Sequence, residues 1–336
     1  MSRAAVALTC GEPSGIGPEI ACRAWSALRD TGPAFFLIGD PAHLPSDAVC
    51  EIISDPAQAG ATMARALPVL AHEFPAPTLP GQPARENAAA VIAVIERGVQ
   101  LVQSGAASAL CTAPIHKKAL KDGAGFAYPG HTEYLAALCG VSRVVMMLAS
   151  PDLRVVPVTI HIALNKVARA LTPALLEDTL RLTHTALLRD FGVPAPRISV
   201  AGLNPHAGEG GVMGTEELRV IIPVLEKLRN EGMDLTGPLS ADTMFHTRAR
   251  AGYDAAVCMY HDQALIPIKT LDFDRGVNVT LGLPIVRTSP DHGTAFDIAG
   301  RGIADATSLI EALKLAENMA RQRADELARQ RAVQND

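Results

Sequence analysis

The sequence is organised as short apolar runs that alternate with amphipathic helical patterns along most of its 336 residues. Runs that are apolar on both faces are typical of parallel strands covered by helices on both sides. Strands that alternate with helices predict a mostly parallel sheet with right-handed crossovers, and therefore an α/β fold. The candidate strands are 4–10, 34–39, 108–113, 144–149, 155–162, 197–203, 255–260 and 277–283.

Two helices between these runs can be located from their end signals. Thr172 predicts an N-cap, and Pro173 after it suits the first helical turn. A second helix is predicted to begin at Thr215, because Glu216 and Glu217 follow in the first turn, where the helix dipole favours acidic side chains. Both helices lie between candidate strands, as the α/β interpretation requires.

Composition narrows the class of protein further. Apolar residues make up 48% but aromatic residues only 4%, so aliphatic side chains must build the core, as in helices packed on a parallel sheet. The length suits two domains or one large α/β unit. A net charge of −5 provides no basic excess for a nucleic-acid surface.

The chain shows no signal for export or for a membrane. The N-terminal apolar run is too short for an export signal, and the longest apolar stretch, from Val144, is interrupted at Pro151. The six cysteines are scattered without a CxxC pair, which indicates reduced thiols. We therefore expect a cytoplasmic protein.

Three histidines follow three candidate strands. His161 ends the run 155–162, His206 lies three residues after 197–203, and His261 comes directly after 255–260. Because ligands bind at the carboxyl ends of the strands in open α/β sheets, the three imidazoles can converge. Any one alone would be an ordinary loop or core histidine. Together they suit Zn²⁺ or a similar borderline ion, with positions left open for a substrate.

Further polar residues suggest a ligand that carries a negative charge. Lys269, Asn278 and Arg287 lie in or beside apolar segments. A cation such as Arg287 is costly to bury there unless it faces an anion. Their clustering favours a carboxylate or phosphate ligand, although a charged residue at a strand end is often merely solvated. His131 and Thr132 follow a Pro-Gly turn at a predicted helix start, where ordinary capping by Thr132 is the alternative.

A glycine-rich loop, GEPSGIGPE, follows the first candidate strand and precedes a helix. This placement resembles a phosphate-binding loop. The chain nevertheless contains neither GxGxxG nor a Walker sequence, which disfavours a standard Rossmann domain and a P-loop kinase.

Seven motifs in order resemble the 4-hydroxythreonine-4-phosphate dehydrogenase family of pyridoxal phosphate biosynthesis. They are GEPSGIGPE, TAPIHKKAL, YPGHTE, GLNPHAGE, GPLSADTMF, MYHDQALIPIK and VNVTLGLPIVRTSPDHGTAFDIAG, and they span about residues 8–305. The resemblance implies two α/β/α domains of the isopropylmalate-dehydrogenase type, with an active-site cleft between them. The cofactor-side domain would comprise residues 1–125 and 270–336. The domain for substrate, metal and dimerisation would comprise residues 126–269.

The resemblance also implies the reaction. The substrate would be the small phosphorylated compound 4-phosphohydroxy-L-threonine, oxidised with NAD⁺ or NADP⁺ and decarboxylated to 3-amino-2-oxopropyl phosphate. The metal would be Zn²⁺, with Mg²⁺ or Co²⁺ as alternatives. The protein would be a homodimer with its active site at the subunit interface.

Residue roles follow from the same motifs. The metal ligands would be His161, His206 and His261, which agrees with the strand-end argument. Substrate would be bound by His131, Thr132, Lys269, Asn278 and Arg287. Asp242 and Asp262 are both candidates for the catalytic base. The loop HGTAFDIAGRGIAD is similar to the adenosine-binding loop of isopropylmalate dehydrogenases, which implies that His292 and Asp297 bind the cofactor.

The sequence departs from the family pattern at His116 and Ala264, where the family has Asn and often Gly. Related dehydrogenases act on threonate or erythronate 4-phosphates, or on a cis-dihydrodiol dicarboxylate. Outside this class, a metal-dependent hydrolase would also use three histidines and a carboxylate. A phosphotransferase or acyltransferase could share the general fold, and a non-catalytic sugar-phosphate binding protein is a further alternative. The loop 292–305 favours a dehydrogenase, because a hydrolase needs no adenosine site.

Overall fold

The computed structural model describes residues 4–335, which fall into two compact units. Unit 1 comprises the chain up to Ser142 and residues Leu283–Ala320. Unit 2 comprises Arg143–Gly282 and the chain from Arg321 onward. The first two boundaries lie further along the chain than the expected domain limits at 125/126 and 269/270, and the segment from Arg321 onward, expected in the cofactor-side domain, falls in unit 2. One reason is that helix α5 (His131–Leu138) packs on α3 (Ala88–Gln103) in unit 1. Another is that strand β11 (Val277–Leu281) pairs with β6 (Val145–Ala149) in unit 2.

Unit 1 contains a sheet of parallel strands in the order β3-β4-β2-β1-β5-β12. The two strands β1 and β2 are buried on both faces, which explains why their sequences are continuous apolar runs. The strands are β1 (Val6–Thr9), β2 (Phe35–Gly39), β3 (Cys50–Ile53), β4 (Leu67–Ala71), β5 (Leu110–Thr112) and β12 (Arg287–Pro290).

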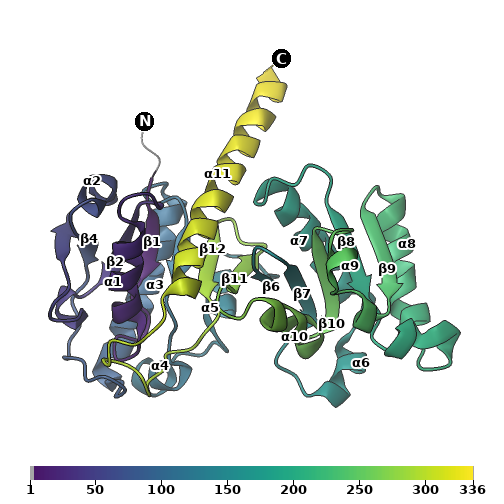
Figure 1. The fold of residues 1–336 in the computed structure, drawn as a ribbon, viewed down its shortest axis with the longest axis horizontal. Helices are drawn as coiled ribbons and strands as arrows, with labels where there is room; N and C mark the ends of the chain where they lie inside the picture. The colour runs from purple at the N-terminus through teal and green to yellow at the C-terminus, as the bar shows by residue number, and fades with distance from the viewer. Residues whose placement is uncertain (1–3, 336) are drawn as a thin grey trace. The chain divides into compact units, whose positions relative to one another are not determined.

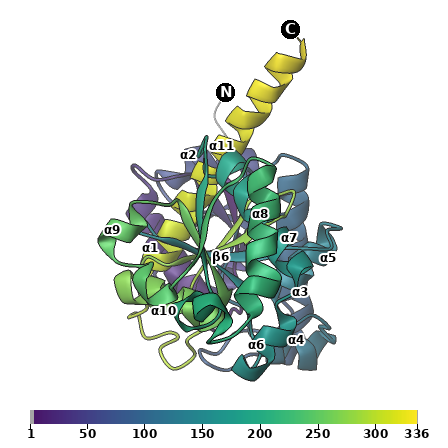
Figure 2. The same ribbon diagram turned by 90° about the vertical axis from the view of Figure 1, so that its right-hand side faces the viewer.

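Helices cover both faces of this sheet. Figures 1 and 2 show α1 on one face and α3 on the other, and α3 contacts β1, β2 and β5. Helix α1 begins after the glycine-rich loop with Pro18 in its first turn, as predicted. The helices are α1 (Gly17–Leu28), α2 (Ala59–Met63), α3 (Ala88–Gln103), α4 (Lys117–Ala124), α5 (His131–Leu138) and the start of α11 (Thr307–Asn335).

Unit 2 contains a mixed sheet in the order β11-β6-β7-β10-β8-β9. Strands β7, β10, β8 and β9 are parallel, whereas β6 runs antiparallel to both β11 and β7. The strands are β6 (Val145–Ala149), β7 (Arg154–Thr159), β8 (Arg197–Ala201), β9 (Asp234–Leu239), β10 (Ala255–Tyr260) and β11 (Val277–Leu281).

The helices of unit 2 lie on both sides of its sheet, with α7 and α8 on one side and α9 and α10 on the other in Figure 2. Helix α7 begins as predicted, because the Thr172 hydroxyl accepts a hydrogen bond from the Leu175 N–H at 3.2 Å. Buried side chains from β6, β7, β10 and α10, among them Leu148, Val155 and Ile268, form one core cluster. The helices are α6 (Val167–Ala170), α7 (Pro173–Arg189), α8 (Ile222–Asn230), α9 (Thr247–Arg250) and α10 (His261–Leu271).

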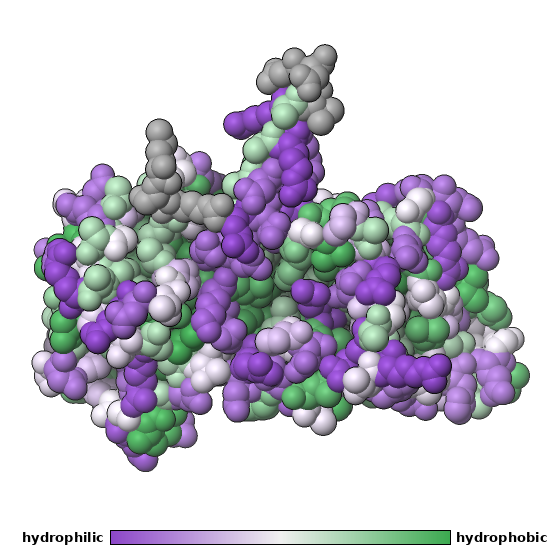
Figure 3. All heavy atoms as spheres, turned by 45° about the horizontal axis from the view of Figure 1, so that its top comes forward, coloured by the Kyte–Doolittle hydropathy of each residue, from purple (hydrophilic) through white to green (hydrophobic). Residues whose placement is uncertain are grey.

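The predicted α/β class with mostly parallel sheets is confirmed, and each of the eight candidate strands overlaps an observed strand. The C-terminal part of α11 carries mostly exposed side chains, which are largely hydrophilic in Figure 3. Within residues 4–335, we find no helix that is long and apolar enough to cross a membrane.

Candidate active site

The three candidate metal ligands follow neighbouring parallel strands of unit 2. Strand β10 pairs in parallel with β7 on one side and with β8 on the other. His161 lies two residues after β7, His206 five residues after β8, and His261 immediately after β10. The carboxyl ends of parallel neighbours meet at one edge of a sheet. The three histidines therefore share the edge that the sequence predicted.

The structure brings two of these side chains together directly. The ring centroids of His161 and His261 lie 5.6 Å apart, and both residues line a cavity of about 260 Å³ with Thr159 and Tyr260. In the described part of the chain, no group of three or more His, Cys, Asp or Glu side chains is assembled closely enough to hold a metal ion. The donor type and strand position of the three histidines fit a borderline divalent ion, while His206 would have to approach the other two.

Two of the three ligand candidates have a strained backbone. His161 has φ 51° and His206 has φ 52°, in the left-handed region that costs an L-residue about 1–2 kcal/mol. Such strain persists only where the surroundings or a function require it. Both imidazoles are exposed, so core packing does not explain why these positions carry histidine.

The two candidate bases differ in their surroundings. Asp262 lies beside His261, with its Oδ1 2.7 Å from His261 Nδ1, and its side chain is 69% exposed. Asp242 is exposed, and its Oδ1 accepts a hydrogen bond of 2.7 Å from the Ser240 hydroxyl. Asp262 therefore orients the imidazole of His261, a candidate metal ligand. The hydrogen bond of Asp242, in contrast, lies within its own turn.

Two of the candidate substrate-binding residues belong to unit 2. Lys269 lies in α10, its ammonium group is 5.2 Å from the ring centre of Phe273, and it lines a cavity with His261 and Asp262. Asn278 lies in β11, and its side-chain Oδ1 is buried without a hydrogen-bond partner within the described residues. A buried amide oxygen of this kind is costly unless a ligand satisfies it.

The other three candidates belong to unit 1. Arg287 in β12 is only 3% exposed and donates two hydrogen bonds to the Thr112 hydroxyl, at 3.2 and 2.6 Å. Burial lowers its pKa to about 10. Burial and the nearby charges of Arg287 and Lys117 hold the pKa of His131 well below its usual range. His131 opens α5 as predicted, whereas Thr132 makes no capping hydrogen bond, because Gly130 is the N-cap.

The loop after β12 carries the two candidate cofactor residues. His292 Nδ1 lies 3.0 Å from the Gly293 carbonyl oxygen, and its buried Nε2 finds no hydrogen-bond partner in residues 4–335. Asp297 is exposed. The Ile16 N–H donates to the Thr294 carbonyl at 3.0 Å, so the glycine-rich loop and this loop lie side by side.

His116, which departs from the family pattern, packs edge-on against Phe296 with ring centroids 4.9 Å apart. This contact places the substitution against the residue that precedes Asp297. Ala264, the other departure, is fully buried in the core of unit 2. Its methyl group therefore packs in the core between α10 and the sheet.

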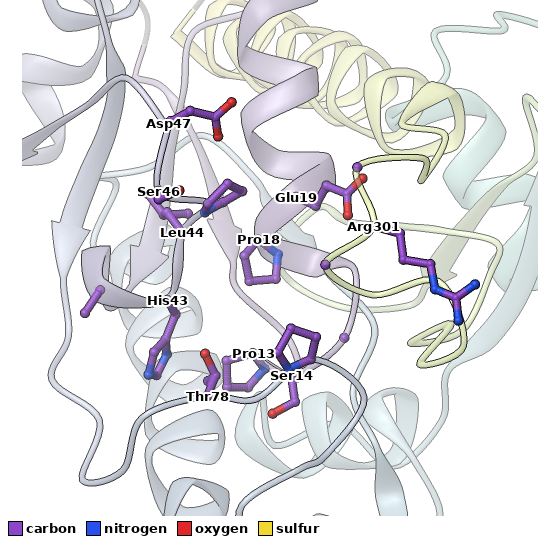
Figure 4. A pocket seen from close by; sticks show the side chains of 16 residues that line it. Pro13, Ser14, Pro18, Glu19, His43, Leu44, Ser46, Asp47, Thr78 and Arg301 are labelled. Carbon is purple, nitrogen blue, oxygen red and sulfur yellow. The ribbon is translucent and has the colours of Figure 1, made fainter.

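A cavity of about 540 Å³ in unit 1 was not predicted from the sequence (Figure 4). Its walls are the glycine-rich loop with the start of α1, the segment from Ala42 to Asp47, Thr78 with Pro80, and residues 300–302 of the candidate cofactor loop. In Figure 4 the guanidinium group of Arg301 points away from His43. The loop motifs at 10–19 and 292–305 could have predicted two of the walls, but nothing in the sequence marks the other two.

The cavity has the size of a small-molecule site, since ligand pockets span about 300–1,000 Å³. Asp297 does not line it, although Gly300, Arg301 and Gly302 of the same loop do. The Ala304 N–H donates to Glu19 Oε1 at 3.0 Å, which ties the end of this loop to the first turn of α1. The residues present fit the uncharged sugar and base of a nucleotide better than a phosphate, because the carboxylates of Glu19 and Asp47 line the cavity and can accept hydrogen bonds.

A family model described as "Pyridoxal phosphate biosynthetic protein PdxA" matches residues 33–316. The chain belongs to the PdxA family. This PdxA protein is 65% identical over 318 residues to a protein of Roseobacter denitrificans named 4-hydroxythreonine-4-phosphate dehydrogenase, a match that covers 94% of this chain and 97% of the relative. The family resemblance predicted from the motifs is thus confirmed.

Solved structures agree with this assignment. The crystal structure of a 4-hydroxythreonine-4-phosphate dehydrogenase from Klebsiella pneumoniae is similar with a TM-score of 0.84 and 36% identity, over 94% of this PdxA chain and 99% of that one. A terephthalate 1,2-cis-dihydrodiol dehydrogenase from Burkholderia xenovorans has a TM-score of 0.67 and 28% identity, over 94% and 98% of the two chains. Both comparisons extend over nearly the whole fold.

Proposed function

We propose that this PdxA protein oxidises 4-phosphohydroxy-L-threonine and decarboxylates the product to 3-amino-2-oxopropyl phosphate, in the biosynthesis of pyridoxal phosphate. The observation that carries the proposal is the 65% identity to a relative named 4-hydroxythreonine-4-phosphate dehydrogenase, over nearly the full length of both chains. The alignment of three histidines at the ends of adjacent parallel strands supports it.

The metal would be held by His161, His206 and His261, and Zn²⁺ suits three neutral imidazoles best. Mg²⁺ and Co²⁺ are the alternatives. Such an ion would supply Lewis acidity, which acidifies a nearby hydroxyl and polarises a ketone. Asp262, next to His261, and Asp242 are the two side chains proposed to take the hydroxyl proton.

The substrate's anionic groups would be bound by Lys269 and Arg287, with Asn278, His131 and Thr132 completing the set. Arg287 is buried, so its charge would interact strongly with a phosphate or carboxylate. His131 is neutral near neutral pH because its pKa is lowered, and it would therefore act as a hydrogen-bonding group rather than as a cation.

The cofactor would be NAD⁺ or NADP⁺, which supplies the hydride acceptor. We assign its adenosine half to the loop that carries His292 and Asp297, which borders the cavity of unit 1 through residues 300–302. A carboxylate near the ribose disfavours the 2′-phosphate of NADP⁺, so we expect NAD⁺ to be preferred.

We also propose a cytoplasmic homodimer. All six cysteines are free thiols, which suits a reducing compartment. Around the histidines of unit 2, Ile162, Leu164 and Ile266 are 42%, 70% and 63% exposed, and a subunit interface would bury such apolar side chains. Analytical ultracentrifugation tests this assignment, and a monomer at micromolar concentration would contradict it.

The activity is tested by absorbance at 340 nm with NAD⁺ or NADP⁺, a divalent metal and a panel of substrates. We expect turnover with 4-phosphohydroxy-L-threonine and release of CO₂. Faster turnover with threonate 4-phosphate, erythronate 4-phosphate or a cis-dihydrodiol dicarboxylate would assign the protein to a paralogous activity. Hydrolysis of a substrate without reduction of the cofactor would reject the dehydrogenase proposal.

A further inference from the structure

The segment that carries His206 has an uncommon backbone. Six consecutive residues, His206 to Gly211, have positive φ values of 52°, 52°, 78°, 41°, 67° and 99°. Three of the six are not glycine, and each of these costs about 1–2 kcal/mol in the left-handed region. Backbone hydrogen bonds close the turn, from the Ala207 N–H to the Asn204 carbonyl and from the Met213 N–H to the Gly208 carbonyl, both at 3.1 Å. A side chain outside the turn holds its entry in addition.

Glu217 is the group that holds the entry to this turn. Its Oε1 accepts hydrogen bonds from the N–H groups of Leu203 and Asn204, both at 2.8 Å, and its Oε2 accepts one from Asn204 Nδ2 at 2.9 Å. The side chain is almost fully buried, at 2% exposure. All three partners are donors, which is the arrangement that an ionised carboxylate requires.

The turn itself packs against the same carboxylate. A Cβ at position 208 would lie 2.6 Å from Glu217 Oε2, and Gly208 has φ 78°, so only glycine fits here. A Cβ at position 202 would lie 2.7 Å from Ala207 Cα. The carboxylate is thus enclosed by the strand end before His206 and by the turn after it.

The local helix geometry places Glu217 at this position. Residues Glu217–Ile221 form a π-helical turn before α8, and π-turns are frequent at functional sites. Glu216, next to it, is only partly buried and its Oε2 accepts from Asn204 Nδ2 at 2.7 Å. Both amide hydrogens of Asn204 are therefore directed at carboxylates, and this fixes the orientation of its amide group.

We propose that Glu217 is a positioning residue that fixes the direction of the His206 imidazole by anchoring the left-handed turn through Leu203 and Asn204. The proposal rests on the assignment of His206 as a metal ligand under the proposed function. It adds a residue that contacts neither metal nor substrate and that acts only through the backbone it holds. Partners that hydrogen-bond a metal ligand directly typically change metal affinity by about 10–100-fold when they are replaced, so we expect an effect through the backbone at the lower end of this range.

Glu217→Gln is the sharpest test, because it keeps the size of the side chain. The amide oxygen can still accept from the two backbone N–H groups, but the new NH₂ group then faces Asn204 Nδ2, donor against donor. Asn204 cannot turn over to avoid this, because its oxygen would face the Glu216 carboxylate. We expect the affinity of the metal-free protein for Co²⁺ to fall about tenfold or more, and amide hydrogen exchange in residues 203–211 to become faster.

The double variant Glu216→Gln/Glu217→Gln tests the direction of these hydrogen bonds. With both carboxylates replaced, the Asn204 amide can turn over so that its oxygen accepts from the new amide at position 217. It then faces no negative charge at position 216, where the amide oxygen keeps the 3.1 Å bond from the Thr215 N–H. We expect this double variant to bind Co²⁺ more tightly than Glu217→Gln alone, a pattern that simple loss of packing does not produce. Glu226→Gln, on the exposed face of α8, is the matched control and should bind as the unaltered protein does.

Failure of this inference can be separated from failure of the metal assignment by including His206→Ala. If His206→Ala loses Co²⁺ binding while Glu217→Gln binds as the unaltered protein does, the positioning role is wrong. If His206→Ala binds Co²⁺ normally, the metal assignment fails instead. In that case, unchanged exchange of residues 203–211 in Glu217→Gln would also reject the anchoring role. A fall in melting temperature with unchanged Co²⁺ affinity would show that Glu217 only stabilises the fold.

Discussion

Replacing Arg287 by Met separates ligand binding from stability in unit 1. Burial lowers the pKa of Arg287 from 12.5 to about 10, which corresponds to roughly 3 kcal/mol of unfavourable free energy for the charged form. The guanidinium group remains protonated at neutral pH, so the folded protein carries this cost throughout the physiological range. Its two hydrogen bonds to Thr112 offset this cost, because a hydrogen bond to a charged group contributes about 1.5 kcal/mol or more.

The Arg287→Met variant removes the buried charge and keeps the apolar stem of the side chain. Removal of the charge and loss of the two hydrogen bonds to Thr112 nearly cancel, so we expect a nearly unchanged melting temperature. Substrate binding should respond differently, because a hydrogen bond to a charged group contributes about 1.5–3 kcal/mol. We therefore expect the KM for 4-phosphohydroxy-L-threonine to rise about tenfold to a hundredfold.

The assay is initial-rate kinetics at 340 nm, with thermal unfolding of the same preparations. Arg65→Met is a suitable control, since Arg65 is an exposed arginine of unit 1 that pairs with Glu51, and it should change neither quantity. An unchanged KM together with a lower melting temperature would refute the reasoning. That result would mean that the hydrogen bonds to Thr112 are the reason for burying Arg287.

Three further predictions follow from the candidate sites. His161→Ala and His261→Ala should each lose turnover by orders of magnitude while the protein stays folded, and full metal occupancy in elemental analysis of both would contradict the ligand assignment. Asp297→Asn should raise the use of NADP⁺ relative to NAD⁺, and an identical ratio of kcat/KM values would show that Asp297 does not contact the ribose. Because the pKa of His131 is lowered in the folded state, the unfolded state binds more protons below about pH 6.5, and stability present above that pH is lost as the pH falls. His131→Asn should therefore lose less melting temperature between about pH 7 and about pH 5, and an equal loss would count against this effect of burial.

The sequence predicted eight of the strands in the described residues but missed β3, β4, β9 and β12. Strands β1, β2, β7 and β10 are buried, so their apolar runs are continuous and easily recognised. Strand β4 contains Pro68, β9 contains Gly237 and Pro238, and β12 reads Arg-Thr-Ser-Pro. Proline, glycine and polar residues argue against a strand when they are considered alone. Pairing with a neighbouring strand overrides these local signals.

The candidate site shows the same contrast. The positions of His161, His206 and His261 after adjacent parallel strands could be predicted, because strand ends can be read from apolar runs. The role of Glu217 could not, since an acidic residue in a first helical turn has an ordinary explanation in the helix dipole. Only the π-helical turn and the folded loop bring its carboxylate under Asn204. Contacts of this kind depend on tertiary structure rather than on local pattern.

Backbone strain gives an independent argument for where the function lies. Within residues 4–335, the non-glycine residues with positive φ are His161, His206, Ala207, Glu209 and Ala295. The first four belong to the candidate metal segments, and Ala295 belongs to the candidate cofactor loop. Glycine would relieve the strain at each position, so stability alone does not favour the residues found there. Proteins break local rules mainly at functional sites, where the side chain or the backbone path is needed for another purpose. The strained positions therefore lie in the same two regions as the sequence motifs, the candidate metal segments and the candidate cofactor loop.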